Sequence, residues 1–163
     1  MKGIMFNNKY FLEDLVFKKH KTQTRRFKKN YDIGETIAIK QDYKHIGILP
    51  YDKIDGDKFA IDLPGWKNKM FVKNERMVYG IVITNVRKEN LQDISDNDCL
   101  EEGIQVEYNG EEYTYWYDDK SYGIRHFNTP QKAFASLIDK VSGKGTWDSN
   151  PTVYVYEFEL KFL

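Results

Sequence analysis

A short basic segment near the start of the chain carries the side chains most suited to chemistry. It reads Lys21-Thr22-Gln23-Thr24-Arg25-Arg26. If the chain extends after Lys21, side-chain alternation places Thr24 and Arg26 on one face, and Lys21 can swing to the same side. An ammonium, a hydroxyl and a guanidinium then surround one small volume, which suits a planar polar ligand with an attached phosphate. The alternative interpretation of the same residues is a solvated basic turn.

A short strand and a helix are predicted before this segment. Residues 3–6 predict a short strand, and Asn7 or Asn8 is expected to cap the helix that follows. We expect that helix to end near Lys19 or His20, because the threonines that follow favour an extended run. The apolar face of the helix is predicted from four residues at helical spacing: Phe11, Leu12, Leu15 and Val16.

The rest of the chain alternates strand and helix patterns. Strands are predicted at 36–40, at 77–86 with apolar residues on both faces, and at 153–162. Helices are predicted after Ser95, with Asp98 at the capping-box position and Gly103 past the end, and from Thr129-Pro130. The second helix is expected to bury Phe134, Leu137, Ile138 and Val141. Residues 43–68 predict a long hairpin or excursion, and 105–128 a loop or irregular hairpin.

Several segments together resemble a known family. The pattern Lys21-x-x-Thr24-x-Arg26 after an N-terminal helix resembles the signature of the ASCH domain family (activating signal cointegrator homology). The resemblance continues through Tyr31-x-x-Gly34-Glu35, through residues 91–104 and through the Trp147–Pro151 segment. It implies one α+β domain over residues 1–163, a PUA-like small β-barrel of mixed strands with two or three packed helices. Lys19 departs from the family, which usually has glycine there, so it must tolerate a left-handed backbone or the helix must end at His20.

The resemblance also implies a function. Family members bind nucleic acids, and a few are enzymes, so a nucleobase, nucleoside or RNA element is expected in a cleft of Lys21, Thr24, Arg26 and Glu102. Further contacts to the nucleobase or RNA are predicted from residues of the basic segment and of the aromatic and closing segments: Thr22, Arg25, Tyr115, Trp116 and Asn150. The segment 113–117 is expected to form a stacking flap, since bases stack on aromatic rings.

An amidohydrolase is the alternative that uses the same cleft. The resemblance implies deacylation of N-acylated cytidine by Lys21, Thr24 and Glu102, with Glu101 as a possible replacement for Glu102. An ordinary lysine is protonated at neutral pH, and burial beside Arg25 would lower its pKa as a base or nucleophile requires. A third alternative is a prophage-type accessory protein that binds a protein partner, which would require an exposed apolar patch.

Composition limits these functions further. The chain has equal numbers of basic and acidic residues, which argues against tight non-specific duplex binding. The charges are segregated, because residues 1–30 carry a net charge of about +7 and residues 91–119 about −10. This pattern indicates either a local patch that steers an anion or two segments that face each other. Cys99 is the single cysteine and His20, His45 and His126 are scattered, so we expect no metal, no cofactor, no membrane span and a cytoplasmic protein.

Overall fold

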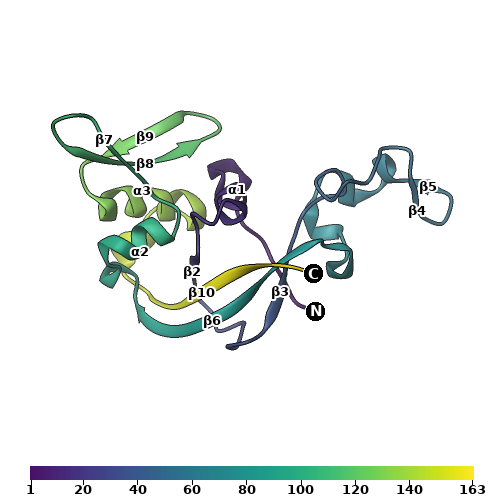
Figure 1. The fold of residues 1–163 in the computed structure, drawn as a ribbon, viewed down its shortest axis with the longest axis horizontal. Helices are drawn as coiled ribbons and strands as arrows, with labels where there is room; N and C mark the ends of the chain where they lie inside the picture. The colour runs from purple at the N-terminus through teal and green to yellow at the C-terminus, as the bar shows by residue number, and fades with distance from the viewer. The chain divides into compact units, whose positions relative to one another are not determined.

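In the computed structural model, which describes residues 1–163, the chain forms two compact units (Figure 1). The first unit, unit 1, consists of Met1–Phe6, Glu35–Val82 and Leu160–Leu163. The second, unit 2, consists of Asn7–Gly34 and Ile83–Glu159. The protein is α+β with a mixed sheet, as predicted at that level. The larger sheet has the strand order β1-β3-β6-β10-β2, and its closure into a barrel stays a prediction. One domain over the whole chain stays a prediction.

Unit 1 is built on three paired strands. Strand β1 (Gly3–Ile4) runs parallel to β3 (Thr36–Ile39), which is antiparallel to the start of β6 (Tyr79–Asn90). The predicted central strand therefore exists and runs longer than expected. The side chains of Ile37 and Ile81 are fully buried. Gly80 is required here, because a Cβ atom at this position would lie 2.6 Å from the carbonyl oxygen of Ile37.

The excursion between β3 and β6 is the other part of unit 1. It contains a two-stranded hairpin and then four short 3-10 helices, and it buries Tyr43, Val72 and Met77 against Trp66. The elements are β4 (Lys53–Asp55), β5 (Lys58–Phe59), η2 (Ala60–Asp62), η3 (Pro64–Trp66), η4 (Lys69–Phe71) and η5 (Asn74–Arg76). It leaves several large apolar side chains exposed, among them Leu49, Tyr51, Met70 and Phe71. The protein-partner alternative would require such residues to form one continuous patch, and it stays a prediction.

In unit 2, β10 (Thr152–Phe162) pairs antiparallel with β2 (Gln23–Arg26) and is the neighbour of β6 in the strand order. The register places Tyr154 opposite Arg26 and Tyr156 opposite Thr24. Val153, Val155, Tyr156 and Phe158 are buried, which agrees with the strand predicted from alternation at 153–162. The basic segment is thus a strand at the end of this sheet.

The basic segment follows two short helices and one residue with a left-handed backbone conformation. The 3-10 helix η1 (Asn8–Tyr10) is capped by Asn7, whose side chain accepts a hydrogen bond from the Lys9 backbone N–H, and α1 (Leu12–Phe17) follows. Lys19 then has φ 59°, in the left-handed region. Of the two alternatives for this position, the structure has the first: the lysine occupies the backbone conformation in which the family usually has glycine.

Lys19→Gly is therefore expected to stabilise the protein by up to about 1 kcal/mol. A left-handed L-residue costs roughly 1–2 kcal/mol, and the entropic cost of glycine, about 0.5–1 kcal/mol, offsets part of the relief. Urea denaturation measures the effect. Lys18→Gly is the matched control, because Lys18 has φ −78° and gains nothing from glycine. Equal effects of the two substitutions would contradict the assignment of strain to Lys19.

The remaining helices of unit 2 follow the predicted caps. Helix α2 (Asp96–Glu101) begins at Ser95, whose Oγ accepts from the Asp98 N–H, and α3 (Pro130–Ser142) begins at Thr129, whose Oγ1 accepts from the Lys132 N–H. Helix α3 buries Phe134 and Leu137 as predicted, but Val141 is exposed because the last turn extends past the core. A short helix, α4 (Thr146–Ser149), was not predicted; its Trp147 ring meets Phe134 edge-on.

Of the two alternatives predicted for residues 105–128, the loop is wrong and the irregular hairpin is nearer to the structure, although the strand pairing is regular. These residues form a regular three-stranded antiparallel sheet of β7 (Gln105–Tyr108), β8 (Tyr113–Asp119) and β9 (Gly123–Phe127). Tyr117 of β8 is buried, with its hydroxyl 2.7 Å from Ser136 Oγ on α3. Aromatic residues occur on both faces of β8, so the hydrophobic alternation that marks a half-buried strand is absent. The expected stacking flap is consequently a fixed central strand.

Candidate functional site

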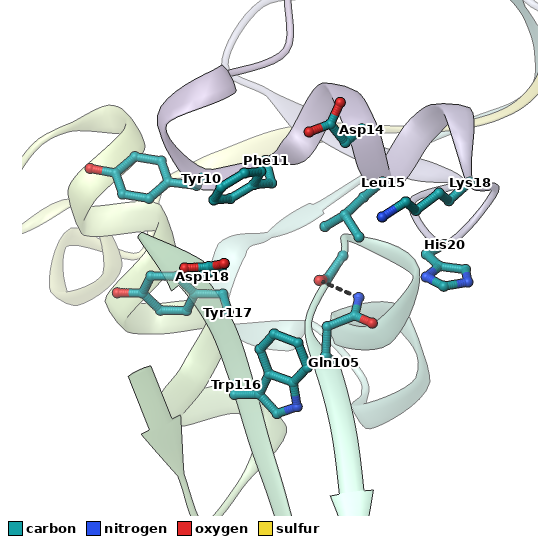
Figure 2. A pocket seen from close by; sticks show the side chains of 11 residues that line it. Tyr10, Phe11, Asp14, Leu15, Lys18, His20, Gln105, Trp116, Tyr117 and Asp118 are labelled. Carbon is teal, nitrogen blue, oxygen red and sulfur yellow. Dashed lines mark hydrogen bonds between the residues drawn. The ribbon is translucent and has the colours of Figure 1, made fainter. Parts of the chain in front are cut away.

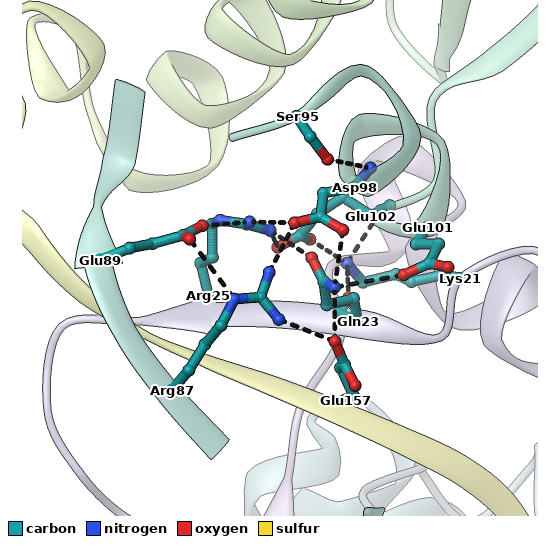
Figure 3. Close-up of polar contacts among 10 residues, drawn as sticks. All are labelled: Lys21, Gln23, Arg25, Arg87, Glu89, Ser95, Asp98, Glu101, Glu102 and Glu157. Carbon is teal, nitrogen blue, oxygen red and sulfur yellow. Dashed lines mark hydrogen bonds and ion pairs between the residues drawn. The ribbon is translucent and has the colours of Figure 1, made fainter. Parts of the chain in front are cut away.

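Lys21 and Glu102 form a buried pair in unit 2. The Lys21 ammonium donates to a Glu102 carboxylate oxygen, and also to the backbone oxygens of Glu102 and Gln23 at 2.8 Å each (Figure 3). These three bonds use all three donors of the ammonium. The Lys21 side chain is 3% exposed and the Glu102 side chain 7%. Burial lowers the pKa of Lys21, although the Glu102 carboxylate acts in the opposite direction.

Arg25 lies beside this pair and contacts the same Glu102 carboxylate. Its Nη1 donates to Glu102 Oε1 at 3.0 Å and to Gln23 Oε1 at 2.6 Å. Its Nη2 contacts Glu89 at 2.7 Å and Asp98 at 3.3 Å. The Arg25 side chain is 1% exposed, so its guanidinium is committed to carboxylates of the protein itself. A planar fork of donors held in this way positions several carboxylates at once.

A second arginine closes the arrangement at the surface. Arg87 on β6 contacts Glu157 at 2.7 Å and Asp98 at 2.5 Å, and Gln23 Nε2 donates to Asp98 and Glu101 at 3.2 Å each. We call the whole set the charged network (Figure 3): Lys21, Gln23, Arg25, Arg87, Glu89, Asp98, Glu101, Glu102 and Glu157. It joins residues of the basic segment to residues of the acidic segment. At these positions the charge segregation in the sequence corresponds to segments that face each other.

The structure divides the predicted cleft between two faces of β2. Gln23 and Arg25 lie on the network face, and alternation places Thr24 and Arg26 on the other. Thr24 and Arg26 therefore share a face, as expected, but Lys21 does not join them, because Glu102 and two backbone oxygens hold its ammonium on the network side. The side-chain arrangement expected around one small volume is not formed.

The other predicted contacts take different positions. The backbone of Thr22 links two elements, since its N–H donates to Glu101 O and its oxygen accepts from Phe158 N, both at 2.9 Å. Asn150, with φ 44°, accepts a hydrogen bond from the Gln92 N–H at 2.9 Å. Tyr115 lies half-buried on β8. Of these residues, only Trp116 lines a cavity described below.

An aromatic hollow lies in unit 2 (Figure 2). We use the name aromatic hollow for a cavity of about 310 Å³ whose walls come from η1 and α1 on one side and from β7 and β8 on the other. Rings of Phe11, Trp116 and Tyr117 line it, together with Asp118 and Gln105. The indole Nε1 of Trp116 is buried without a hydrogen-bond partner. An unsatisfied buried donor is uncommon, and this one has almost no accessible surface in the hollow.

Gly103 separates the hollow from Lys21. This glycine lines the hollow and directly follows Glu102. A Cβ atom on it would lie 3.1 Å from Leu15 Cδ1 and 3.7 Å from the Lys21 Cβ, and its φ of 113° already disfavours other residues. The hollow and the Lys21–Glu102 pair are thus neighbours across a single residue.

Sequence reasoning missed four members of the network: Gln23, Arg87, Glu89 and Glu157. Arg87 and Glu89 have a detectable signal, because they alternate with Lys88 at the polar end of the β6 strand pattern. Two charged residues two positions apart on a central strand have their side chains on the same face of the sheet. Gln23 had no signal, since an amide between two threonines is ordinary in an exposed strand.

The structure contains no group of three or more His, Cys, Asp or Glu side chains arranged to hold a metal ion. None of its helices is long and apolar enough to span a membrane. Comparison with protein-family models, with curated proteins and with solved structures finds no match. The functional argument therefore depends on the residues and their geometry.

Proposed function

We propose that the protein is an ASCH-type domain that recognises a nucleobase or nucleoside in the aromatic hollow of unit 2. The observation that carries this proposal is the set of aromatic rings that line one cavity from two sides, Tyr10 and Phe11 on one and Trp116 and Tyr117 on the other. The PUA-like barrel form of the fold belongs to the same proposal. The predicted cleft at Lys21 and Arg26 is replaced by the hollow next to it.

Size and ring content favour a base over other small ligands. Stacking of one base on aromatic side chains contributes about 1–3 kcal/mol. A cavity of about 310 Å³ is at the lower end of the volumes typical of small-molecule sites, about 300–1,000 Å³. It accommodates a base with its sugar and leaves little room for a longer chain.

Polar groups around the rings supply the selectivity. The Asp118 carboxylate can accept a hydrogen bond from an exocyclic amino group, and the Gln105 amide can donate or accept. Asp14 and Asp118 disfavour a polyphosphate in the hollow, while Lys18 at its margin adds positive charge. This combination supports a nucleoside or a terminal base as the ligand.

Isothermal titration calorimetry with the common nucleosides tests the proposal. Trp116→Ala is expected to weaken binding roughly 5–150-fold, because the stacking contribution of about 1–3 kcal/mol is removed. Trp116→Phe keeps the ring and removes only the N–H donor, so it should have the smaller effect. Trp66→Phe is the control, since Trp66 lies in the other unit. Folded protein that binds none of the nucleosides would rule out recognition in the hollow.

Deacylation of N-acylated cytidine is a second candidate, favoured by one specific observation. Lys21 is buried, its pKa is lowered by that burial, and its ammonium contacts the Glu102 carboxylate. An amine that loses its proton more readily is the form that a general base or nucleophile requires. Because Gly103 lines the hollow and directly follows Glu102, this second candidate places the acylated base in the hollow, beside the pair.

A further inference from the structure

Strand β7 forms an open edge of the three-stranded sheet in unit 2. The strand order is β7-β8-β9, so β7 has a paired strand on one side only. The Asn109 N–H donates to the Glu112 oxygen at 3.1 Å, which makes these two residues a hydrogen-bonded pair at the hairpin end. Hydrogen-bonded and non-hydrogen-bonded pairs alternate along antiparallel strands. The backbone N–H and C=O groups of Val106 and Tyr108 therefore point away from β8, toward the open side of β7.

The side chains along this edge are apolar and exposed on one face. Val106 and Tyr108 are two residues apart, so they share a face of the sheet, and they are 45% and 58% exposed. Tyr113 of β8 lies opposite Tyr108 in the register, with the centroids of the two rings 5.1 Å apart, and is 61% exposed. A strand added at β7 would cover these apolar side chains with those of one of its own faces.

A small pocket lies at the start of the same edge. We call it the edge pocket; it has a volume of about 250 Å³ and is lined by His20, Leu100, Ile104, Gln105 and Val106. The volume is below the range of about 300–1,000 Å³ that is typical of small-molecule sites, so the edge pocket suits a single side chain. Sites that bind a peptide as an added strand combine main-chain hydrogen bonds at a sheet edge with pockets for alternate side chains. Strand β7 has both features.

The charges along β7 and β8 are acidic. Residues 105–119 contain no lysine or arginine and five acidic residues: Glu107, Glu111, Glu112, Asp118 and Asp119. The three glutamates are exposed. Glu107 Oε1 lies 3.8 Å from His126 Nδ1, and a long contact of this kind between exposed side chains contributes little to stability. Glu107 is therefore available to a basic side chain of a partner.

The same charge disfavours a second copy of this chain at the edge. If two β7 strands paired antiparallel through the outward groups of Val106 and Tyr108, the two Glu107 side chains would lie directly opposite each other. Like charges in that position are destabilising, and charged side chains on edge strands commonly prevent self-association in this way. A strand with lysine or arginine opposite Glu107 does not have this penalty.

We propose that β7 binds an extended basic segment of a partner protein by strand addition. The added strand alternates apolar side chains, which cover Val106 and Tyr108, with lysines or arginines, one of which faces Glu107. The other edge of the sheet, β9, carries Arg125 and packs against α3, so a basic strand is disfavoured there. The proposal does not rest on nucleoside binding in the aromatic hollow, since neither Val106 nor Tyr108 lines that cavity.

Fluorescence anisotropy with a labelled peptide of about eight alternating valines and lysines, a length within the usual range of strands, tests the proposal. A peptide with glutamate in place of lysine is expected to bind at least about tenfold more weakly, because its charges repel those of the edge. Glu107→Gln should weaken binding of the lysine peptide by about 2–5-fold, as for an exposed ion pair. Glu159→Gln is the matched control, since Glu159 is an exposed glutamate on β10 in the same unit.

Val106→Pro tests the strand addition itself. Proline removes the N–H that points away from β8, so the hydrogen bonds between β7 and β8 remain, and proline is tolerated at such edge positions. Peptide binding should fall at least about fivefold, because one hydrogen bond corresponds to about 2–12-fold in affinity and the ring also obstructs the edge. Val106→Thr keeps the N–H and should bind the peptide like the unmodified protein. Circular dichroism verifies that both variants are folded.

Three results would overturn the proposal: no binding of the valine–lysine peptide, equal binding of the glutamate peptide, or unchanged affinity in folded Val106→Pro. Sedimentation velocity tests the other occupant, because a dimer that Val106→Pro dissociates would assign the edge to a second copy of the chain. Val106→Pro should still bind nucleosides, since Val106 is not part of the aromatic hollow. Peptide binding by a protein that binds no nucleoside would contradict recognition in the hollow and support the edge proposal alone.

Discussion

Glu102→Gln is expected to lower the free energy of unfolding by about 3–5 kcal/mol, the range found when one partner of a buried ion pair is removed. The substitution keeps the size of the side chain but removes the charge that faces both Lys21 and Arg25. These two cations remain buried, because their side chains are 3% and 1% exposed. Urea denaturation at neutral pH, followed by circular dichroism, measures the change.

Glu101→Gln is the matched control for this loss. Glu101 is adjacent in sequence and belongs to the same network, but it contacts only the amides of Gln23 and Asn97, at 3.2 Å each, and is half-buried. Its substitution should cost less than about 1 kcal/mol, as for other surface polar contacts. Lys21→Met added to Glu102→Gln should recover part of the stability, because the pair is then removed as a whole. Similar losses at Glu101 and Glu102 would refute the buried-pair explanation.

The parts of the fold that depend on local signals could be predicted from the sequence. Ser95 and Thr129 cap their helices as expected, because capping involves side chains and N–H groups three residues apart. Strand β10 follows an alternation in the sequence, and β3 follows the turn predicted directly before it. The β7–β8–β9 sheet was missed because its strands carry tyrosines and acidic residues instead of an alternating apolar face. Its regularity comes from strand pairing and from packing on α3, which local pattern does not encode.

The candidate site was predictable only in part. Alternation along an extended strand correctly places Thr24 with Arg26, and the resemblance to the ASCH family joined Lys21 to Glu102, which are in contact. The burial of Arg25 among carboxylates could not be predicted from the sequence, because its partners Glu89 and Asp98 lie more than 60 residues away in the chain. Each of those contacts removes a charge from the surface. A segment that is basic in sequence therefore becomes part of a compensated network in the structure.

For Trp116, the sequence predicted a role but not a location in the fold. The sequence predicted Trp116 as a base-binding residue on a mobile flap, and the structure places it on a strand that lines a cavity. Base binding was predicted from the residue type alone, because an indole is a flat ring with one hydrogen-bond donor. The location depended on η1 and α1 packing opposite β8, a contact between residues about 100 positions apart.

Turnover of N-acetylcytidine is expected to fall more than about 100-fold in Lys21→Met, because general acid–base catalysis contributes about 10²–10⁴-fold. Chromatographic detection of released cytidine measures it, with activity expressed per folded protein. If the neutral amine of Lys21 acts, kcat/KM should rise with pH and level off below the ordinary lysine pKa of 10.5, since burial lowers the pKa of Lys21. A rate that is flat with pH, or that survives in Lys21→Met, would rule out the lysine as the reacting base.

Stability changes in the same pH window and must be separated from the rate. Between the lowered pKa of folded Lys21 and the ordinary value of 10.5, the unfolded chain binds more protons at this position than the folded one. The contribution of Lys21 to stability therefore rises with pH across that window. Circular dichroism recorded at each pH distinguishes more folded protein from faster turnover.

Thr24→Val tests whether the structure or the family resemblance correctly identifies the residues that take part in deacylation. The resemblance gives Thr24 a part in catalysis, but the structure places it on the face of β2 opposite the Lys21–Glu102 pair. We therefore expect Thr24→Val to keep most of the turnover that Lys21→Met loses. If both variants lose turnover equally while remaining folded, the reaction requires an arrangement in which β2 turns Thr24 toward Lys21, and the hollow beside Gly103 is not where the acylated base reacts.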